Sequence, residues 1–354
     1  MTLRIGIVGT GFAKRVQLPG LRLVPEVEVT AISSGQRANA DAVAREFGIP
    51  HVFDDGVDLA RSGRADLVLV SSTPASHARY AVAALEAGCH LLCEKPLALD
   101  AAEAWQIVAA AERRPRQVAW VDHELRYEPN RRRIRDLVRE GAIGDVRHIE
   151  IALKPYIRGD GRPQAPNAAW TWWFDAAQGG GILGAVGSHL IDLCRFWTGR
   201  EVVQVAGRAQ TFVRERVDAA GTTRPATADE FASAVLTLAG GVIVTLTLSI
   251  VAQHGPGHIA QISGTEGSLV LSGETRLEIG KPGGPLEDIS VPDDLSGKTA
   301  VNNMWARSFV RLMRDLAATI GGGPTEGEPA TIRDGWRIQR VLDAIRTGGC
   351  TPLD

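Results

Sequence analysis

Short apolar runs alternate with helical patterns in the first third of the chain. The expected strands cover residues 3–8, 27–32, 66–71, 90–93 and 118–121. The expected helices cover residues 39–47, 77–87 and 100–113. Gly48 and Gly88 follow two of these helices, and Asp100 is suited to cap the third. Mostly apolar strands separated by helices are typical of a parallel sheet that is covered on both faces.

The pattern changes after an expected helix over residues 128–139. Alternating, β-branched runs cover residues 146–153, 202–217, 230–238, 242–251, 259–263, 268–271 and 276–279. Glycine-punctuated runs of this kind predict a large, mostly antiparallel sheet. Further helices are expected over residues 186–197, 305–320 and 332–346. We therefore expect a parallel α/β domain over residues 1–123. A second α/β domain built on the large sheet should cover residues 124–354, with its last helices packed back on the first.

Composition and charge exclude several classes of protein. The 354 residues contain 39 Lys and Arg and 41 Asp and Glu, which gives a net charge of −2. Because phosphate binding usually needs a basic face, nucleic acid is not expected as the partner. The run Arg131-Arg132-Arg133 with Arg135 is interpreted as a solvated helix face, with a phosphate patch as the alternative. No run of about 18 apolar residues occurs, so no membrane span is expected.

The cysteines and histidines predict neither a disulfide framework nor a metal site. The cysteines are Cys89, Cys93, Cys194 and Cys350, and no C-x-x-C pair occurs among them. Scattered cysteines in a chain of this size favour a reducing compartment, and we expect the cytoplasm. His254 and His258 have no carboxylate or cysteine at ligand spacing, so no metal is expected.

A glycine turn follows the first expected strand. Gly9-x-Gly11 between a strand and a helix is what a dinucleotide pyrophosphate needs, although Lys14 stands where a third glycine is usual. After the second strand no acid is present to bind a ribose 2′-hydroxyl. Ser33 and Arg37 are suited instead to a 2′-phosphate, which favours NADP, with NAD as the alternative. Arg37 as the cap of a surface loop is the other interpretation.

Glu94-Lys95-Pro96 follows the fourth expected strand. A lysine at the carboxyl end of a parallel strand lies where open α/β sheets bind ligands. Its ammonium group can stabilise a developing alkoxide and exchange a proton with it. The proline restricts Lys95 to an extended backbone and is a candidate for a cis peptide bond.

Motifs along the whole chain resemble the Gfo/Idh/MocA family, the glucose–fructose oxidoreductase and inositol dehydrogenase-like oxidoreductases. The motifs are Ser72-Thr73-Pro74, His77, Ala84, Leu85, Gly88, Glu94-Lys95-Pro96-Leu97, Arg126-Tyr127-x-Pro129, Gly141-x-Ile143-Gly144, Gly179-Gly180-Gly181, Gly187-Ser188-His189-Leu190-Ile191-Asp192, Asp334-Gly335 and Gln339. The resemblance implies a Rossmann domain followed by a substrate-binding and oligomerisation domain.

The resemblance also implies roles for individual residues. Lys95 and His189 would be catalytic. Residues expected to contact the cofactor are Gly9, Gly11, Phe12, Ser33, Arg37, Ser72, Thr73, Pro74, His77, Glu94, Lys95 and His123, which stands where the family often has asparagine. Residues expected to contact the substrate are Arg126, Tyr156, Trp173 and Asp192.

Ala185 departs from the family pattern. Many members have a carboxylate four residues before the histidine, where it shares one helix face with that histidine. Three interpretations remain. Lys95 and His189 suffice; the substrate or another side chain, such as Tyr156 or Asp175, supplies the missing group; or the protein binds cofactor with little catalysis. Asp192, three residues after His189, is a substitute acid or only a surface acid near a turn.

The expected reaction is hydride transfer between nicotinamide C4 and a carbinol or ketone carbon of a sugar, inositol or related polyol. Trp170, Trp172 and Trp173 suit sugar faces or, equally, a core or subunit interface. The alternatives are a glycoside hydrolase with transient oxidation by NAD, and a non-catalytic nucleotide-binding regulatory protein. The open-faced sheet must be covered, and the resemblance implies a homodimer or homotetramer.

Overall fold

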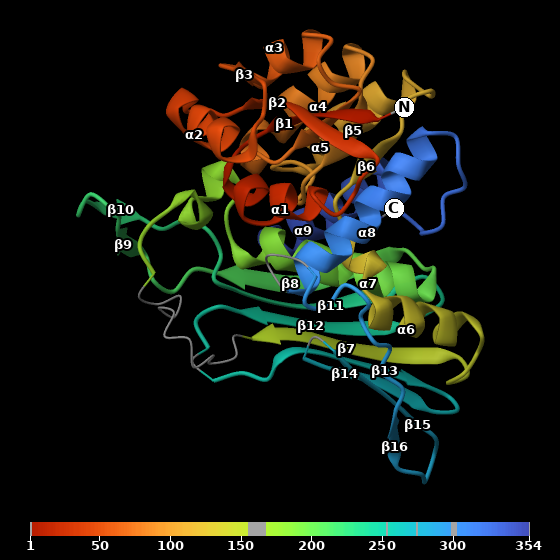
Figure 1. Ribbon diagram of the computed structural model, residues 1–354. Coiled ribbons are helices and arrows are strands. Elements are labelled where there is room, and N and C mark those ends of the chain that lie inside the picture. The colour runs from red at the N-terminus through yellow and green to blue at the C-terminus, as the bar shows by residue number, and fades with distance from the viewer. Residues whose placement is uncertain (1, 155–167, 253, 274, 299–302, 354) are drawn as a thin grey trace. The chain divides into compact units, whose positions relative to one another are not determined.

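The computed structural model describes residues 2–154, 168–252, 254–273, 275–298 and 303–353. The chain divides into two compact units, which Figure 1 shows in ribbon form. The first comprises Met1–Glu128 and Asp294–Gln339, and the second comprises Pro129–Asp293 and Arg340–Asp354. A segment from near the C-terminus therefore belongs to the same unit as the first third of the chain.

The first unit is built on a parallel sheet of six strands in the order β3-β2-β1-β4-β5-β6. The strands are β1 (Leu3–Val8), β2 (Val27–Ser33), β3 (His51–Phe53), β4 (Leu67–Val70), β5 (His90–Cys93) and β6 (Ala119–Val121). Every pair in this sheet is parallel, which confirms the expected architecture. The sequence prediction did not include β3, because three residues are too few to show a period of two.

Helices connect these strands and cover both faces of the sheet. They are α1 (Leu18–Leu21), α2 (Arg37–Phe47), α3 (Gly56–Arg61), α4 (His77–Glu86) and α5 (Ala101–Glu112), joined by α8 (Met304–Ile320) and the first half of α9 (Ile332–Thr347). Gly48 ends α2 in the left-handed conformation with φ 74°. Asp100 caps α5 by accepting a hydrogen bond from the Glu103 N–H. Both positions follow the ordinary rules for helix ends.

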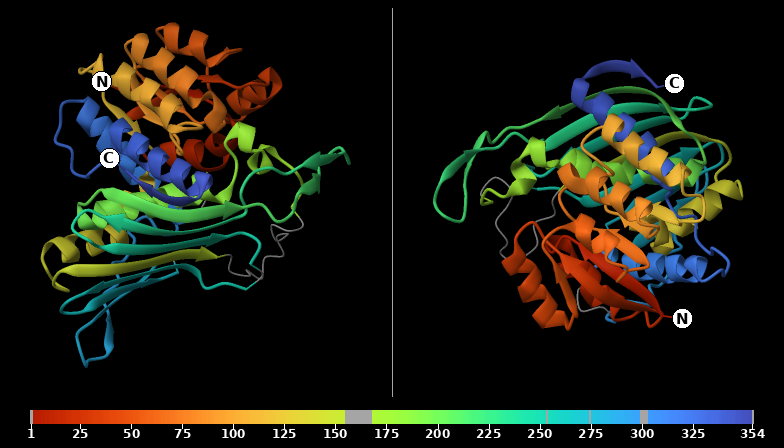
Figure 2. Two further views of the ribbon diagram at one scale, coloured as in Figure 1. Left: turned by 180° about the vertical axis from the view of Figure 1, so that it is seen from behind. Right: turned by 90° about the horizontal axis from the view of Figure 1, so that it is seen from above.

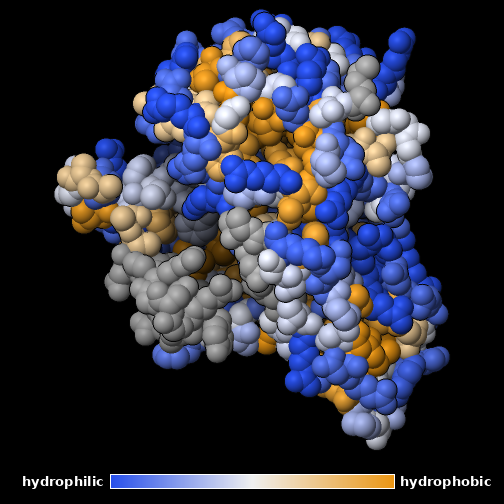
Figure 3. Space-filling model, viewed as in Figure 1, coloured by the Kyte–Doolittle hydropathy of each residue, from blue (hydrophilic) through white to orange (hydrophobic). Residues whose placement is uncertain are grey.

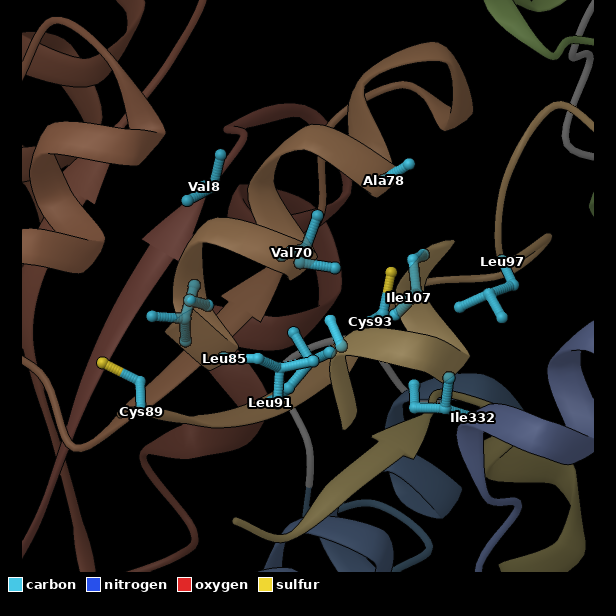
Figure 4. Close-up of a cluster of buried hydrophobic side chains, with 14 of the residues drawn as sticks. Val8, Val70, Ala78, Leu85, Cys89, Leu91, Cys93, Leu97, Ile107 and Ile332 are labelled. Carbon is cyan, nitrogen blue, oxygen red and sulfur yellow. The ribbon is translucent and has the colours of Figure 1, made fainter. Parts of the chain in front are cut away.

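Two hydrophobic clusters lie on opposite faces of the parallel sheet. Along β4, Val68 and Val70 belong to one cluster, whereas Leu67 and Leu69 belong to the other. The first cluster includes Leu85, Cys93, Leu97 and Ile107, drawn in Figure 4. The second includes Phe309, Val310 and Met313 of α8. Because successive strand residues point to opposite faces, a continuous apolar run is what a sheet with two covered faces requires.

The second unit is built on a nine-stranded mixed sheet in the order β16-β15-β14-β13-β7-β12-β11-β8-β17. The strands are β7 (Val146–Lys154), β8 (Val202–Gln210), β11 (Phe231–Leu238), β12 (Ile243–Ser249), β13 (Gly257–Gly264), β14 (Ser268–Ser272), β15 (Arg276–Gly280), β16 (Leu286–Asp288) and β17 (Gly349–Pro352). All neighbours are antiparallel except β7 and β12. The expected single strand over residues 202–217 is instead β8 and the separate β9 (Glu215–Val217), which pairs with β10 (Thr223–Pro225).

The two faces of this sheet differ in burial. Ile149 and Ile151 of β7 and Leu246 of β12 are buried on one face. On the opposite face, Thr245 and Val235 are direct cross-strand partners, and Val235 is 44% exposed. Helices α6 (Pro129–Arg139) and α7 (Ser188–Thr198) pack against each other in this unit (Figures 1 and 2). The alternation is that of a sheet with one covered and one open face.

Arg131 does not lie on a solvated face as expected. Its side chain is fully buried, and Nη2 lies 2.5 Å from His258 Nδ1. The Trp197 indole N–H donates to the Arg131 carbonyl oxygen at 3.0 Å. The prediction was therefore wrong for this arginine, because the position shares the apolar stripe of α6 with Ile134. Hydrophilic residues cover most of the surface seen in Figure 3, with apolar residues visible between them.

Candidate active site

The loops that follow four parallel strands meet at one edge of the first unit's sheet. β1 leads to Gly9, β4 to Ser71, β5 to Glu94 and β6 to Asp122. The strand order changes direction between β1 and β4, because β2 and β3 lie on one side of β1 and β4 to β6 on the other. Open α/β sheets bind ligands beside the carboxyl ends of the strands at such a point. This edge is therefore the candidate site of the first unit.

The Gly9 turn brings the backbone close to the loop after β4. Gly9 has φ 109°, and its N–H donates to the Ser33 carbonyl oxygen at 2.9 Å. A Cβ atom at Gly9 would lie 2.3 Å from the Ser71 oxygen, so only glycine fits. A Cβ at Gly11 would meet nothing within 4 Å, and Phe12 leads into the helical segment η1 (Ala13–Gln17) and α1. Such a glycine cradle before a helix fits a pyrophosphate.

The end of β2 is polar and partly exposed. Ser33, the last residue of β2, is buried. Ser34 is half-buried, and its Oγ lies 3.3 Å from Thr10 Oγ1 at the end of β1. Thr10 is therefore a further hydroxyl group at this edge, beside the serines that follow from the sequence. Its signal was present, since it lies between Gly9 and Gly11.

Arg37 lies at the start of α2 and forms two ion pairs. Nε donates to Asp41 at 2.9 Å, and Nη1 donates to Asp54 at 2.9 Å. Asp41 is one helical turn further along α2, and Asp54 directly follows β3. The pairs are exposed to solvent, so their attraction is screened and contributes little to stability. No acid directly follows β2 in the sequence, but folding brings two acids to the guanidinium group.

His77 connects the loops after β4 and β5. Its ring nitrogens lie 3.0 Å from the Pro96 carbonyl oxygen and 3.1 Å from the Ser72 carbonyl oxygen. Burial lowers the pKa of His77 to about 4, although both carbonyl contacts oppose this. The neutral ring carries one N–H, so it donates a hydrogen bond to one of these two carbonyl oxygens and lies against the other. Thr73 adjoins the short helix η2 (Pro74–Ser76), and its carbonyl oxygen accepts from the Ser76 N–H at 2.9 Å. The Lys95–Pro96 peptide bond is cis.

Glu94 is held by a hydrogen-bonded chain that the sequence did not reveal. The Ser71 hydroxyl donates to Gln17 Oε1 at 2.5 Å, and Gln17 Nε2 donates to Glu94 Oε1 at 2.8 Å. The Lys95 backbone N–H lies 3.3 Å from Glu94 Oε2. The chain links residues after β1, β4 and β5, so the carboxyl group beside Lys95 has a fixed orientation. Gln17 looked like an ordinary helix residue and gave no signal in the sequence.

Three buried carboxyl groups lie in the segments that directly follow β5 and β6. Glu94 is 7% exposed, Glu124 is 2% exposed and Asp122 is fully buried. Burial raises the pKa of Asp122 well above its usual range, and the charges of Glu94 and Glu124 raise it further. Burial, with Glu94, raises the pKa of Glu124 to about 8. Burial also raises the pKa of Glu94, while Lys95 opposes that change. For all three groups, burial is the largest cause of the raised pKa, because it disfavours the charged form.

His189 and Asp192 lie in the second unit, on α7, and both are buried. Asp192 Oδ1 lies 3.8 Å from Arg195 Nη1, so the interpretation of Asp192 as a surface acid is wrong. Ala185 lies in η7 (Leu183–Gly187), the turn that leads into α7. The Asp229 carboxylate accepts from the Leu183 N–H at 2.7 Å and caps this turn.

The remaining predicted site residues have mostly structural contacts. Arg126, in η3 (Glu124–Tyr127), is buried and donates from Nη1 to the Glu328 carbonyl oxygen at 3.1 Å. Trp173 packs edge-on against Phe174. Asp175 caps a short helical turn by accepting from the Ala177 N–H at 3.0 Å. Tyr156 lies outside the described residues.

The fold and the glycine cradle define a nucleotide-binding α/β protein, and comparison with known proteins makes this specific. Residues 3–123 match the model described as "Oxidoreductase family, NAD-binding Rossmann fold", and residues 131–270 match the "GFO/IDH/MocA C-terminal domain". The chain therefore belongs to the GFO/IDH/MocA family of NAD-binding oxidoreductases. This confirms the family resemblance found in the sequence.

Relatives and solved structures cover nearly the whole chain. An uncharacterized oxidoreductase of Synechocystis sp. is 30% identical over 97% of this chain and 93% of its own length. Glucose-fructose oxidoreductase domain-containing protein 2 of Xenopus laevis is 29% identical over 97% and 90% of the two lengths.

Among solved structures, an oxidoreductase domain protein from Kribbella flavida has a TM-score of 0.87 and 27% identity, with both chains fully covered. Levoglucosan dehydrogenase, solved with NADH and levoglucosan, has a TM-score of 0.84 over 98% and 96% of the chains. Its identity is 23%, so this likeness shows a shared fold. Among the described residues, no helix is both long and apolar enough to cross a bilayer.

Proposed function

We propose that this protein is an NAD(P)-dependent dehydrogenase or reductase that acts on CH–OH or C=O groups of a sugar, inositol or related polyol. Residues 1–123 would bind the cofactor, and residues 124–354 would bind the substrate and mediate self-association. The observation that carries the proposal is Lys95 beside the fixed Glu94 carboxyl group, at the same sheet edge as the Gly9 cradle. Chemistry of this kind belongs at the carboxyl ends of parallel strands.

Lys95 is the proposed proton-transfer residue. When bound, the nicotinamide supplies or accepts a hydride at C4. In the reductive direction, Lys95 donates a proton to the carbonyl oxygen of the substrate as that oxygen becomes an alkoxide. In the oxidative direction, the Lys95 amine removes the hydroxyl proton. Glu94 orients Lys95, and the buried surroundings strengthen every charge interaction at the reacting oxygen.

His189 is the proposed second group that exchanges a proton with the substrate. A carboxylate next to a histidine mainly tunes its basicity and orientation, so Ala185 need not abolish activity. Arg126, Trp173, Asp192 and Tyr156 remain the proposed substrate contacts. Trp170 and Trp172 are further aromatic faces for a sugar ring.

The proposed cofactor contacts comprise two kinds of residue. Gly9, Gly11 and Phe12 would hold the pyrophosphate, and Ser72, Thr73, Pro74, His77 and His123 would line the cleft near the nicotinamide. Ser33 and Arg37 supported NADP in the sequence, and this stays a prediction. The ion pairs of Arg37 argue against a preference for NADP. A 2′-phosphate would meet the negative charges of Asp41 and Asp54 as well as the guanidinium group.

Self-association and location complete the proposal. Val235 and Ile243 are exposed on the outer face of the mixed sheet, which supports a homodimer or homotetramer that covers this face. Light scattering at micromolar concentration should give a dimer or tetramer, and a monomer would contradict the proposal. All four cysteines are free thiols, which supports a cytoplasmic location.

The first test is titration of the purified protein with NADPH and with NADH, followed by tryptophan fluorescence. The expected result is saturable quenching by at least one of the two, followed by a steady change in absorbance at 340 nm with members of a keto-sugar panel. Binding of neither nucleotide would overturn the proposal. Binding without turnover of any panel member would favour the second candidate function, a nucleotide-binding regulatory protein, which the missing acid at Ala185 supports.

A further inference from the structure

The C-terminal motif of the sequence has no role in the proposed reaction. Asp334, Gly335 and Gln339 all lie in α9, and Gln339 is fully buried although its side chain is polar. Burying an amide group costs free energy unless the group forms hydrogen bonds. The first half of α9 belongs to the first unit, which also contains the loop over residues 95–99, here called the lysine loop. The contacts of this half of α9 indicate what the motif does.

The start of α9 is fixed to the edge of the parallel sheet. The Asp334 carboxylate accepts from the Thr331 N–H at 2.9 Å and from the Thr331 hydroxyl group at 2.7 Å. Thr331 forms a β-bridge with Trp120 of β6, and the Val121 N–H donates to the Ala330 carbonyl oxygen at 2.9 Å. The first turn of the helix is therefore fastened to β6, the strand next to β5 in the sheet.

Gly335 lets α9 approach the lysine loop closely. A Cβ atom at Gly335 would lie 3.0 Å from Leu97 Cδ2, 3.2 Å from Leu97 Cβ and 3.4 Å from Val121 Cγ1. Leu97 lies two residues after Lys95, in the same buried cluster as Ile332 of α9 (Figure 4). Glycine is unfavourable in the interior of a helix relative to alanine, so a glycine here needs a reason. The close approach to Leu97 supplies that reason.

Gln339 holds the far end of the lysine loop. Its Nε2 donates to the Leu99 carbonyl oxygen at 3.1 Å, and the Leu99 N–H donates to Glu103 Oε2 at 3.3 Å. At the near end of the loop, the Pro96 carbonyl oxygen lies 3.0 Å from His77 Nδ1. The loop is therefore held at Pro96, directly after the lysine, and again at Leu99.

We propose that α9 positions Lys95 for proton transfer, with Gln339 and Gly335 as the positioning residues. Gln339 holds the loop through its hydrogen bond to Leu99, and Gly335 leaves the space that Leu97 occupies. Neither residue is assigned a contact with substrate or cofactor, so both act through the loop. A proton moves only between groups within hydrogen-bond reach, so a displaced loop should slow the reaction. The inference rests on the proposed function, in which Lys95 exchanges that proton.

The first experiment measures the reactivity of Lys95 without cofactor or substrate. The folded protein is labelled with trace acetic anhydride at pH 8, and acetylation at each lysine is measured by peptide mass spectrometry. Lys95 is half-buried in wild type, whereas the reference residues Lys14 and Lys281 are exposed. Gln339→Met and Gly335→Ala should each raise the labelling of Lys95 relative to the references about 3-fold or more, because a released loop exposes the amine more often.

Gln117→Met is the matched control for the loss of an amide group. Gln117 also lies in the first unit, and its Nε2 donates to the Gly88 carbonyl oxygen at 3.3 Å, before β5 and β6 at the opposite end of these strands. Gln117→Met should leave the relative labelling of Lys95 unchanged. Thermal unfolding establishes that each variant is folded, and should Gln339→Met or Gly335→Ala fail to fold, the other variant decides.

Steady-state kinetics with an active keto-sugar give the second readout. Gln339→Met and Gly335→Ala should each lower kcat about 10-fold, while the dissociation constant for the nucleotide changes less than about 2-fold. Wild-type labelling of Lys95 in a folded variant would overturn the inference, as would a wild-type kcat or an equal change in Gln117→Met. Because labelling needs no nucleotide, failure of wild type to bind any nicotinamide nucleotide would separately overturn the proposed function.

Discussion

Two regions along the candidate ligand-binding edge of the parallel sheet differ in how deeply their charged residues are buried. At the β2 end, Arg37 is exposed and paired with two exposed acids. At the β5 and β6 end, Glu94, Asp122 and Glu124 are buried, and Gln17 fixes Glu94 by a hydrogen bond. Exposed charges are screened and reorient easily, whereas buried charges keep their geometry and shift one another's pKa values. The proposed function accordingly assigns proton chemistry to the buried end and cofactor selection to the exposed end.

Replacement of Lys95 should have the largest effect on the rate of the reaction. We expect Lys95→Ala to lower kcat about 10²- to 10⁴-fold, because the reacting oxygen loses its proton donor. The dissociation constant for the nucleotide should change much less. Steady-state kinetics with an active keto-sugar, beside the exposed control Lys298→Ala, checks this. Turnover equal to that of wild type would refute the role of Lys95.

Gly9→Ala should disrupt the cradle that lies between the two ends. The new Cβ would lie 2.3 Å from the Ser71 oxygen at a φ of 109°, so the turn must move. We expect a loss of about 1–3 kcal/mol in the free energy of unfolding and a loss of nucleotide binding. Denaturant unfolding and fluorescence titration measure both. Gly35→Ala is the matched control, since a Cβ there meets nothing within 4 Å, and it should retain both properties.

The free energy of unfolding should depend on pH because Glu124, after β6, is a buried acid. Unfolded Glu124 ionises near its ordinary pKa, whereas the folded carboxyl group stays protonated up to a pKa of about 8. Folding therefore opposes ionisation, and this residue makes wild type less stable as the pH rises from about 4.5 to 8. Glu124→Gln should raise the Tm of the cofactor-free protein by about 2 °C or more at pH 9 and much less at pH 5. A Tm difference that is the same at both pH values would contradict the pKa shift.

Charge changes at the β2 end should have the smallest effects, and they should concern the choice of cofactor. Asp54→Asn removes one of the two acids on Arg37, so the affinity for NADPH relative to NADH should rise about 3- to 10-fold. Arg37→Ala should lower the same ratio. Fluorescence titrations of the two variants measure it, with Asp58→Asn as an exposed control. Unchanged ratios in both variants would show that Arg37 does not face the ribose.

Sequence patterns predicted the architecture because each main element has an unambiguous period. The fully apolar β4 and the alternating β11 show the two kinds of sheet directly. Motifs located Gly9, Glu94 and Lys95, because each stands at a recognisable strand end. Gln17 and Asp54 were missed because their importance depends on residues 77 and 17 positions away. Arg131 was misjudged, since a run of arginines gives no sign that one of them faces a buried histidine.

One measurement tests most directly whether Lys95 serves the chemical step and Arg37 serves the choice of cofactor. Single-turnover rates and nucleotide dissociation constants are compared for wild type, Lys95→Ala and Arg37→Ala with one active keto-sugar. The account predicts that Lys95→Ala loses rate at nearly unchanged nucleotide affinity, and that Arg37→Ala changes the ratio of NADPH to NADH affinity at nearly unchanged rate. A Lys95→Ala protein that reacts as fast as wild type once saturated with nucleotide would contradict it.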